Sequence, residues 1–134
     1  MITRLDHVAI SVTDLDRSIE FYSQHFHMEA YAVHRQPVGQ LLAIAYLRSP
    51  QGVLELMHAP GRQVGDATHF CFVSDDFDAT FDRLVEEGVS VKRAPHPTRA
   101  RVPTEEGWQR CVFNGPDGEE VELRGPSRRP TPAA

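Results

Sequence analysis

Two histidines and two glutamates carry the chemistry that this sequence most clearly suggests. His7, Glu55, His69 and Glu122 each lie in a short strand-like run, on the face opposite its large apolar side chains. Imidazole nitrogens and carboxylate oxygens bind first-row divalent ions, and a set of two nitrogens and two oxygens leaves positions open for water or substrate. We therefore expect these four residues to bind one divalent metal ion, which could be Ni, Zn, Mn, Co or Fe.

The elements that position these residues occur twice along the chain. Displacing the sequence by 62 positions places His7 on His69 and Asp14 on Asp76, and the apolar helical positions that follow also coincide. Each half reads as a strand, an Asp helix cap, a helix and three more strands. We expect strands at 5–12, 28–34, 41–48, 53–57, 68–73, 89–93, 108–114 and 120–124, with helices beginning at 15 and 77.

This pattern predicts an α+β fold of two βαβββ modules that form a cupped mixed sheet with the helices on its outer face. The modules cover residues 4–58 and 66–125 of a single domain over 1–125. Each module supplies one histidine and one glutamate, so the proposed site is itself duplicated.

Two segments fall outside the repeat. Residues 95–107 contain three prolines and are expected to form a long loop, a kind of segment that often binds ligands. Arg99 and Arg101 in this loop are candidates for holding an acidic group of a substrate, and two solvated arginines are the alternative. Residues 126–134 are proline-rich without large apolar side chains, and we expect a disordered tail. Both cysteines, Cys71 and Cys111, lie in apolar runs and are expected to be buried and reduced.

Length and charge narrow the range of partners. The chain has 134 residues, with 14 Lys and Arg against 19 Asp and Glu, for a formal net charge of -5. This charge has the wrong sign for a nucleic-acid-binding protein. No apolar run is long enough to span a membrane, and the first residues lack the apolar run of a signal peptide. We therefore expect a cytoplasmic protein that binds a small molecule.

Several short motifs resemble the vicinal oxygen chelate superfamily, which includes glyoxalase I, methylmalonyl-CoA epimerase, extradiol dioxygenases and the fosfomycin and bleomycin resistance proteins. The resemblance covers residues 4–125. It rests on His7-Val8-Ala9-Ile10, Asp14-Leu15-Asp16-Arg17-Ser18, Phe21-Tyr22, Leu54-Glu55-Leu56, His69-Phe70 and Gly115-Pro116-Asp117-Gly118 before Val121-Glu122-Leu123.

The resemblance implies that two modules enclose one metal ion, with the ligand positions on His7, Glu55, His69 and Glu122. This order of ligands is most similar to glyoxalase I, in which a ligand carboxylate moves a proton beside a metal-bound substrate. By position Glu122 is then the catalytic base, with Glu55 as the alternative. Members of the superfamily commonly form homodimers, so the site is built either within one chain or across two.

The sequence departs from glyoxalase I where glutathione is held. Ser11 and Ala59 stand where that family carries an Arg and an Asn, so we do not expect a glutathione-linked substrate. The expected function is that of a metal-dependent lyase or isomerase that transfers a proton on a small oxygen-chelating metabolite. The alternatives are a single-domain dioxygenase and a non-catalytic, bleomycin-resistance-like binding protein. A dioxygenase prefers to bind its metal through two histidines and one carboxylate. A fourth protein ligand therefore counts against the dioxygenase alternative.

Overall fold

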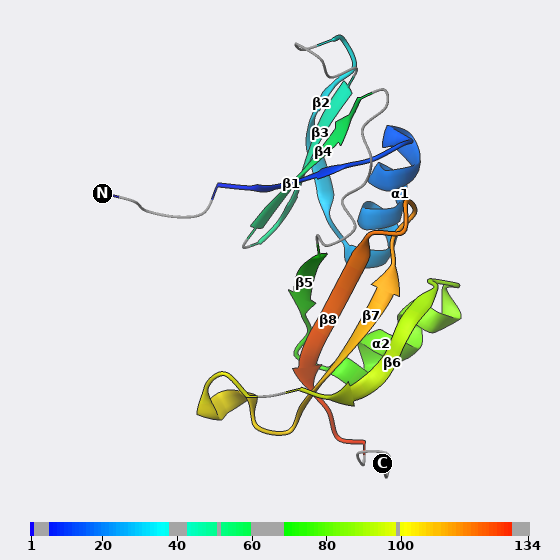
Figure 1. Cartoon of the computed structure of the whole chain (residues 1–134). Coiled ribbons are helices and arrows are strands. Elements are labelled where there is room, and N and C mark those ends of the chain that lie inside the picture. Colours follow the sequence, from blue (N-terminus) through cyan, green and yellow to red (C-terminus); the bar gives the residue numbers. More distant parts are fainter. Residues whose placement is uncertain (2–5, 38–42, 51, 60–68, 99, 130–134) are drawn as a thin grey trace. The chain divides into compact units, whose positions relative to one another are not determined.

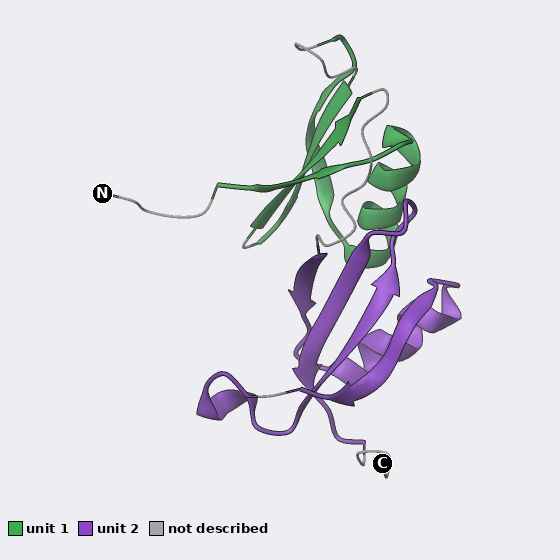
Figure 2. Cartoon of the chain, viewed as in Figure 1, with its two compact units in different colours: residues 1–66 green, residues 67–134 purple. Residues whose placement is uncertain are grey.

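The computed structural model of the chain describes residues 1, 6–37, 43–50, 52–59, 69–98 and 100–129. The chain divides into two compact units, residues 1–66 and 67–134 (Figure 2). Among the described residues, each unit contains one α-helix and one four-stranded sheet with both parallel and antiparallel neighbours. The prediction of an α+β fold with two βαβββ modules is therefore confirmed. Within the described ranges, no helix is long and apolar enough to cross a membrane.

The two units share the order strand, helix and three strands, and the second also contains a 3-10 helix between its second and third strands (Figure 1). The first contains β1 (Val8–Ser11), α1 (Leu15–Phe26), β2 (Glu29–His34), β3 (Ala43–Ser49) and β4 (Gly52–His58). The second contains β5 (His69–Val73), α2 (Phe77–Glu86), β6 (Val91–Pro97), the 3-10 helix η1 (Pro103–Glu105), β7 (Trp108–Asn114) and β8 (Glu120–Pro126). The strand orders are β1-β4-β3-β2 and β5-β8-β7-β6, so the first strand of each unit pairs in parallel with the last.

Equivalent caps start the two helices. An Asp14 carboxylate oxygen accepts the backbone N–H of Arg17 at 3.0 Å, and Asp76 accepts that of Ala79 at 3.1 Å. Each cap satisfies an N–H group that the first helical turn leaves without a partner. Helix α1 contacts β3 and β4, and α2 contacts β8. These contacts cover one face of each sheet, so polar side chains of the strands can be placed on the other.

Three details differ from the sequence-based expectations. Strand β6 continues to Pro97, into the segment expected to be a loop. It is an edge strand of its sheet, and proline, which has no N–H, is tolerated there because an N–H on the solvent side makes no hydrogen bond within the sheet. Cys71 is exposed, whereas Cys111 is buried, and both are free thiols. The expected tail begins with ordered contacts, since Ser127 donates to Asp78 at 2.7 Å and Arg129 pairs with Asp82.

Candidate metal centre and adjoining pocket

Strand register brings one histidine and one glutamate together in each unit. Glu55 lies opposite Ala9, two residues after His7, and Glu122 lies opposite Cys71, two residues after His69. His7 Nε2 is 2.8 Å from Glu55 Oε2, and His69 Nε2 is 3.5 Å from Glu122 Oε2. The two pairs therefore have the same relation to their sheets, as the internal repeat predicts.

The pair in the first unit is held by two further residues. His7 Nδ1 donates to Asp6 Oδ2 at 2.9 Å, so the ring places Nε2 toward Glu55. The hydrogen bond to Asp6, opposed by partial desolvation and reinforced by the charge of Glu55, raises the pKa of His7. Tyr46 lies directly opposite Glu55 on β3. Burial, the charge of Glu55 and a hydrogen bond to that carboxylate raise the pKa of Tyr46. Glu55 is thus flanked by an imidazole and a neutral phenol.

The pair in the second unit is held by a cation. Arg110 Nε donates to Glu122 Oε1 at 2.9 Å, which leaves Oε2 directed toward His69. Nη1 of the Arg110 guanidinium lies 3.3 Å from His96 Nε2. The Glu122 side chain is only 10% exposed. A carboxylate this buried needs a charged partner, and Arg110 supplies it.

The spacing of both pairs suits two ligands of one metal ion. Ligands at about 2.0 to 2.2 Å from an ion, separated by angles of roughly 90 to 109°, lie about 2.8 to 3.6 Å apart. The distances in the two pairs, 2.8 and 3.5 Å, fall in this range. No group of three or more His, Cys, Asp or Glu side chains is close enough to hold a metal ion in the part of the chain that the structure describes. Within the described residues, each unit therefore brings together two side chains of the kinds that bind divalent metals, and not all four.

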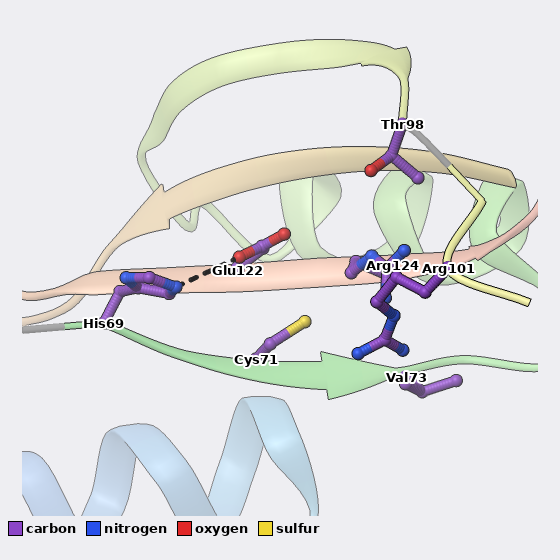
Figure 3. A pocket seen from close by; sticks show the side chains of 7 residues that line it. All are labelled: His69, Cys71, Val73, Thr98, Arg101, Glu122 and Arg124. Atoms are coloured by element: carbon purple, nitrogen blue, oxygen red, sulfur yellow. Dashed lines mark ion pairs between the residues drawn. The ribbon is translucent and has the colours of Figure 1, made fainter.

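A pocket of about 410 Å³ adjoins the second pair (Figure 3). Its lining residues come from β5, β8 and the segment after β6, and they are His69, Cys71, Val73, Thr98, Arg101, Glu122 and Arg124. Of the two arginines expected to bind an acidic group, Arg101 lies on this pocket. Arg99 lies outside the described residues.

A buried glutamate joins two of the pocket arginines. Glu105 in η1 accepts Arg101 Nε at 2.9 Å and Nη2 at 2.6 Å, and it accepts Arg124 Nη2 at 3.1 Å. The hydrogen bonds from Arg101, assisted by those from Arg124 against the effect of burial, lower the pKa of Glu105 to about 2. Glu105 is therefore ionised throughout the ordinary pH range. We call Arg101, Glu105 and Arg124 the arginine clasp.

Sequence reasoning missed most residues around the two pairs. Arg124 shares the strand parity of Glu122 and could have been found by the same alternation. Glu105 follows Arg101 by four residues, a spacing that also hints at an ion pair. Arg110 gives no comparable signal, because its contact with Glu122 depends on the register between β7 and β8. Tyr46 gives no such signal either, because the bond of its hydroxyl to Glu55 depends on the register between β3 and β4.

Two βαβββ units that each carry a histidine–glutamate pair on the parallel strands define a duplicated α+β fold. The chain belongs to the Glyoxalase/Bleomycin resistance protein/Dioxygenase superfamily, whose family model matches residues 4–123. This match confirms the resemblance to the vicinal oxygen chelate superfamily.

Similar proteins include named enzymes of two kinds. An ethylmalonyl-CoA/methylmalonyl-CoA epimerase of Cereibacter sphaeroides is 30% identical over 72% of this chain and 80% of its own length. A probable lactoylglutathione lyase of Vibrio cholerae is 32% identical over 90% of this chain and 88% of its own. Among solved structures, a glyoxalase I mutant from Zea mays has a TM-score of 0.72 at 24% identity, and the match covers 90% of this chain but 44% of that longer chain. The structural likeness supports the fold.

Proposed function

We propose that this protein is a metal-dependent lyase or isomerase that moves a proton on a small metabolite with two neighbouring oxygen atoms. His7, Glu55, His69 and Glu122 would hold the ion, with the two half-sites combined either within one chain or across a homodimer. The observation that carries the proposal is the recurrence of a histidine–glutamate pair, at ligand spacing, on equivalent strands of both units.

The donor set suits proton transfer next to a carbonyl group. A divalent ion held by these residues would supply Lewis acidity to the substrate and would thereby acidify the C–H bond next to its carbonyl group. Glu122 is the proposed base: Arg110 fixes its Oε1, and its Oε2 is directed toward His69. Glu55 remains the alternative base, restrained by Tyr46. A positioned carboxylate in this role contributes a rate factor of about 100 to 10,000.

The substrate is proposed not to be linked to glutathione. Ser11 and Ala59 offer neither a cation nor an amide at the places where the resemblance to glyoxalase I calls for both. Similarity to an epimerase supports proton transfer on a substrate without glutathione. Similarity to probable lactoylglutathione lyases supports the same class of proton transfer and makes the glutathione question directly testable.

The test is a screen for C–H exchange. Metal-loaded protein is incubated in D2O under nitrogen with a panel of 2-oxo and 2-hydroxy acids and their thioesters, and deuterium at the carbon next to the carbonyl is followed by NMR. We expect exchange with the wild type and a loss of about 100-fold or more in E122Q. The matched control is E87Q, which removes a surface carboxylate paired with Arg83 on α2 and should exchange like the wild type.

Two results would contradict the proposal. Oxygen uptake coupled to product formation under air would favour the dioxygenase alternative. Binding of these acids without exchange or turnover, in protein that retains its metal, would favour a binding protein.

A further inference from the structure

The pocket beside His69 and Glu122 has the character of an anion site. Its charged lining consists of Arg101, Arg124 and Glu122, while Thr98 adds a hydroxyl group (Figure 3). Including Arg110, three guanidinium groups face two carboxylates, Glu105 and Glu122, in this unit. Arginine forks bind carboxylates through parallel N–H donors, so an arginine-rich pocket of this size suits a small organic acid.

The arginine clasp shows which anion fits the arginines. Glu105 receives Nε and Nη2 of Arg101 together with Nη2 of Arg124, so a carboxylate already occupies the space between the two guanidinium groups. The two arginines differ in freedom. The Arg124 side chain is 8% exposed and lies over the Trp108 ring, with 5.5 Å between its guanidinium carbon and the ring centroid. The Arg101 side chain is 68% exposed, so it can turn toward a ligand while Arg124 keeps Glu105 paired.

We propose that this pocket binds a carboxylate group of the substrate through Arg101, with Glu105 as the internal counter-ion that the incoming carboxylate replaces on that arginine. In the context of the proposed function, on which this assignment of the substrate rests, the metabolite is an organic acid whose carboxylate lies beside the metal-chelating oxygens. Arg124 is a positioning residue that holds Glu105 and the wall of the pocket.

Opposite effects of two substitutions in the clasp test this inference. Binding of malonate to chelator-treated protein is measured by isothermal titration calorimetry, with malonamide as the uncharged comparison and inorganic phosphate as the competing anion class. R101Q removes the ligand for the carboxylate and should weaken malonate binding by about tenfold or more. E105Q removes the competing carboxylate and should strengthen it several-fold. R83Q, which removes a surface cation of the same unit, should leave binding unchanged.

A purely structural clasp predicts a different result, because both substitutions break the same contact. Weaker binding in both R101Q and E105Q would overturn the inference, as would equal binding of malonamide or tighter binding of phosphate. If E105Q does not fold, R101K replaces it as a test, since it keeps the charge without the fork and should bind more tightly than R101Q. Malonate binding is measured without metal, so absence of metal from the purified protein would contradict the proposed function and the assignment of the acid as its substrate, while the malonate results alone decide whether Arg101 binds a carboxylate.

Discussion

The contact between Arg110 and Glu122 leads to a prediction whose size follows from the structure. Its atoms are 2.9 Å apart, and the side chains are 25% and 10% exposed. At an effective dielectric constant of about 20, the Coulomb attraction at this distance is roughly 5 to 6 kcal/mol. Desolvation of the two charges offsets most of it, which leaves about 1.5 to 3 kcal/mol, as is typical of hydrogen bonds to charged groups. We expect R110M to lower the free energy of unfolding by this amount.

The assay is urea unfolding of chelator-treated protein in a double-mutant cycle of R110M and E122Q. The expected coupling energy is about 1 to 2 kcal/mol. Arg48 and Glu29 provide a matched control, since they also form a cross-strand pair, at 3.2 Å, but their side chains are 54% and 69% exposed. The cycle of R48M and E29Q should give less than about 0.5 kcal/mol. Equal coupling energies in the two cycles would refute the reasoning that Arg110 holds a buried Glu122.

Three further predictions concern packing, pH and substrate. A Cβ atom at Gly125 would lie 2.2 Å from the Ser74 carbonyl oxygen, so G125A should cost about 1 to 3 kcal/mol in urea unfolding, whereas G52A, with its nearest contact at 3.8 Å, should change stability by less than about 1 kcal/mol. The pKa of Glu105 falls from 4.5 to about 2 on folding, mainly through Arg101, so its stabilisation is complete above about pH 4.5 and lost as the pH falls toward 2. In E105Q the free energy of unfolding should therefore fall less steeply between pH 4.5 and 2 than in the wild type. The same fall in both proteins would contradict the lowered pKa of Glu105. Methylglyoxal with glutathione should give little or no lactoylglutathione in a spectrophotometric assay, and rapid formation would refute the exclusion of glutathione.

The sequence predicts the elements well where a local signal exists. Asp14 and Asp76 mark the helix starts because a cap is a contact within one turn. Strand alternation also predicts that His7 and Glu55 share a face, and the structure brings them within 2.8 Å. The end of β6 was predicted wrongly, because Pro95 and Pro97 indicate a loop when the position of the strand in its sheet is unknown. The strand lies at the edge of the sheet, where proline is tolerated.

Long-range register explains what alternation could not supply. The bond from Arg110 to Glu122 needs the alignment of β7 with β8, and the irregular pairing of β6 with β7 brings His96 to Arg110. The arginine clasp depends on how the loop after β6 returns to β8, which places Glu105 against Arg124. The repeat predicted the two histidine–glutamate pairs, whereas the contact of Arg110 with Glu122 became visible only in the fold.

The proposed four-ligand metal site can be tested by measuring the metal content of the protein. Protein purified without added metal is analysed for Ni, Zn, Mn, Co and Fe, together with E55A, E122A and the surface control E29A. We expect about one equivalent per chain in the wild type and in E29A, with loss of most of it in both E55A and E122A, since each removes one of the four proposed ligands. Retention of a full equivalent by both E55A and E122A would contradict the four-ligand site.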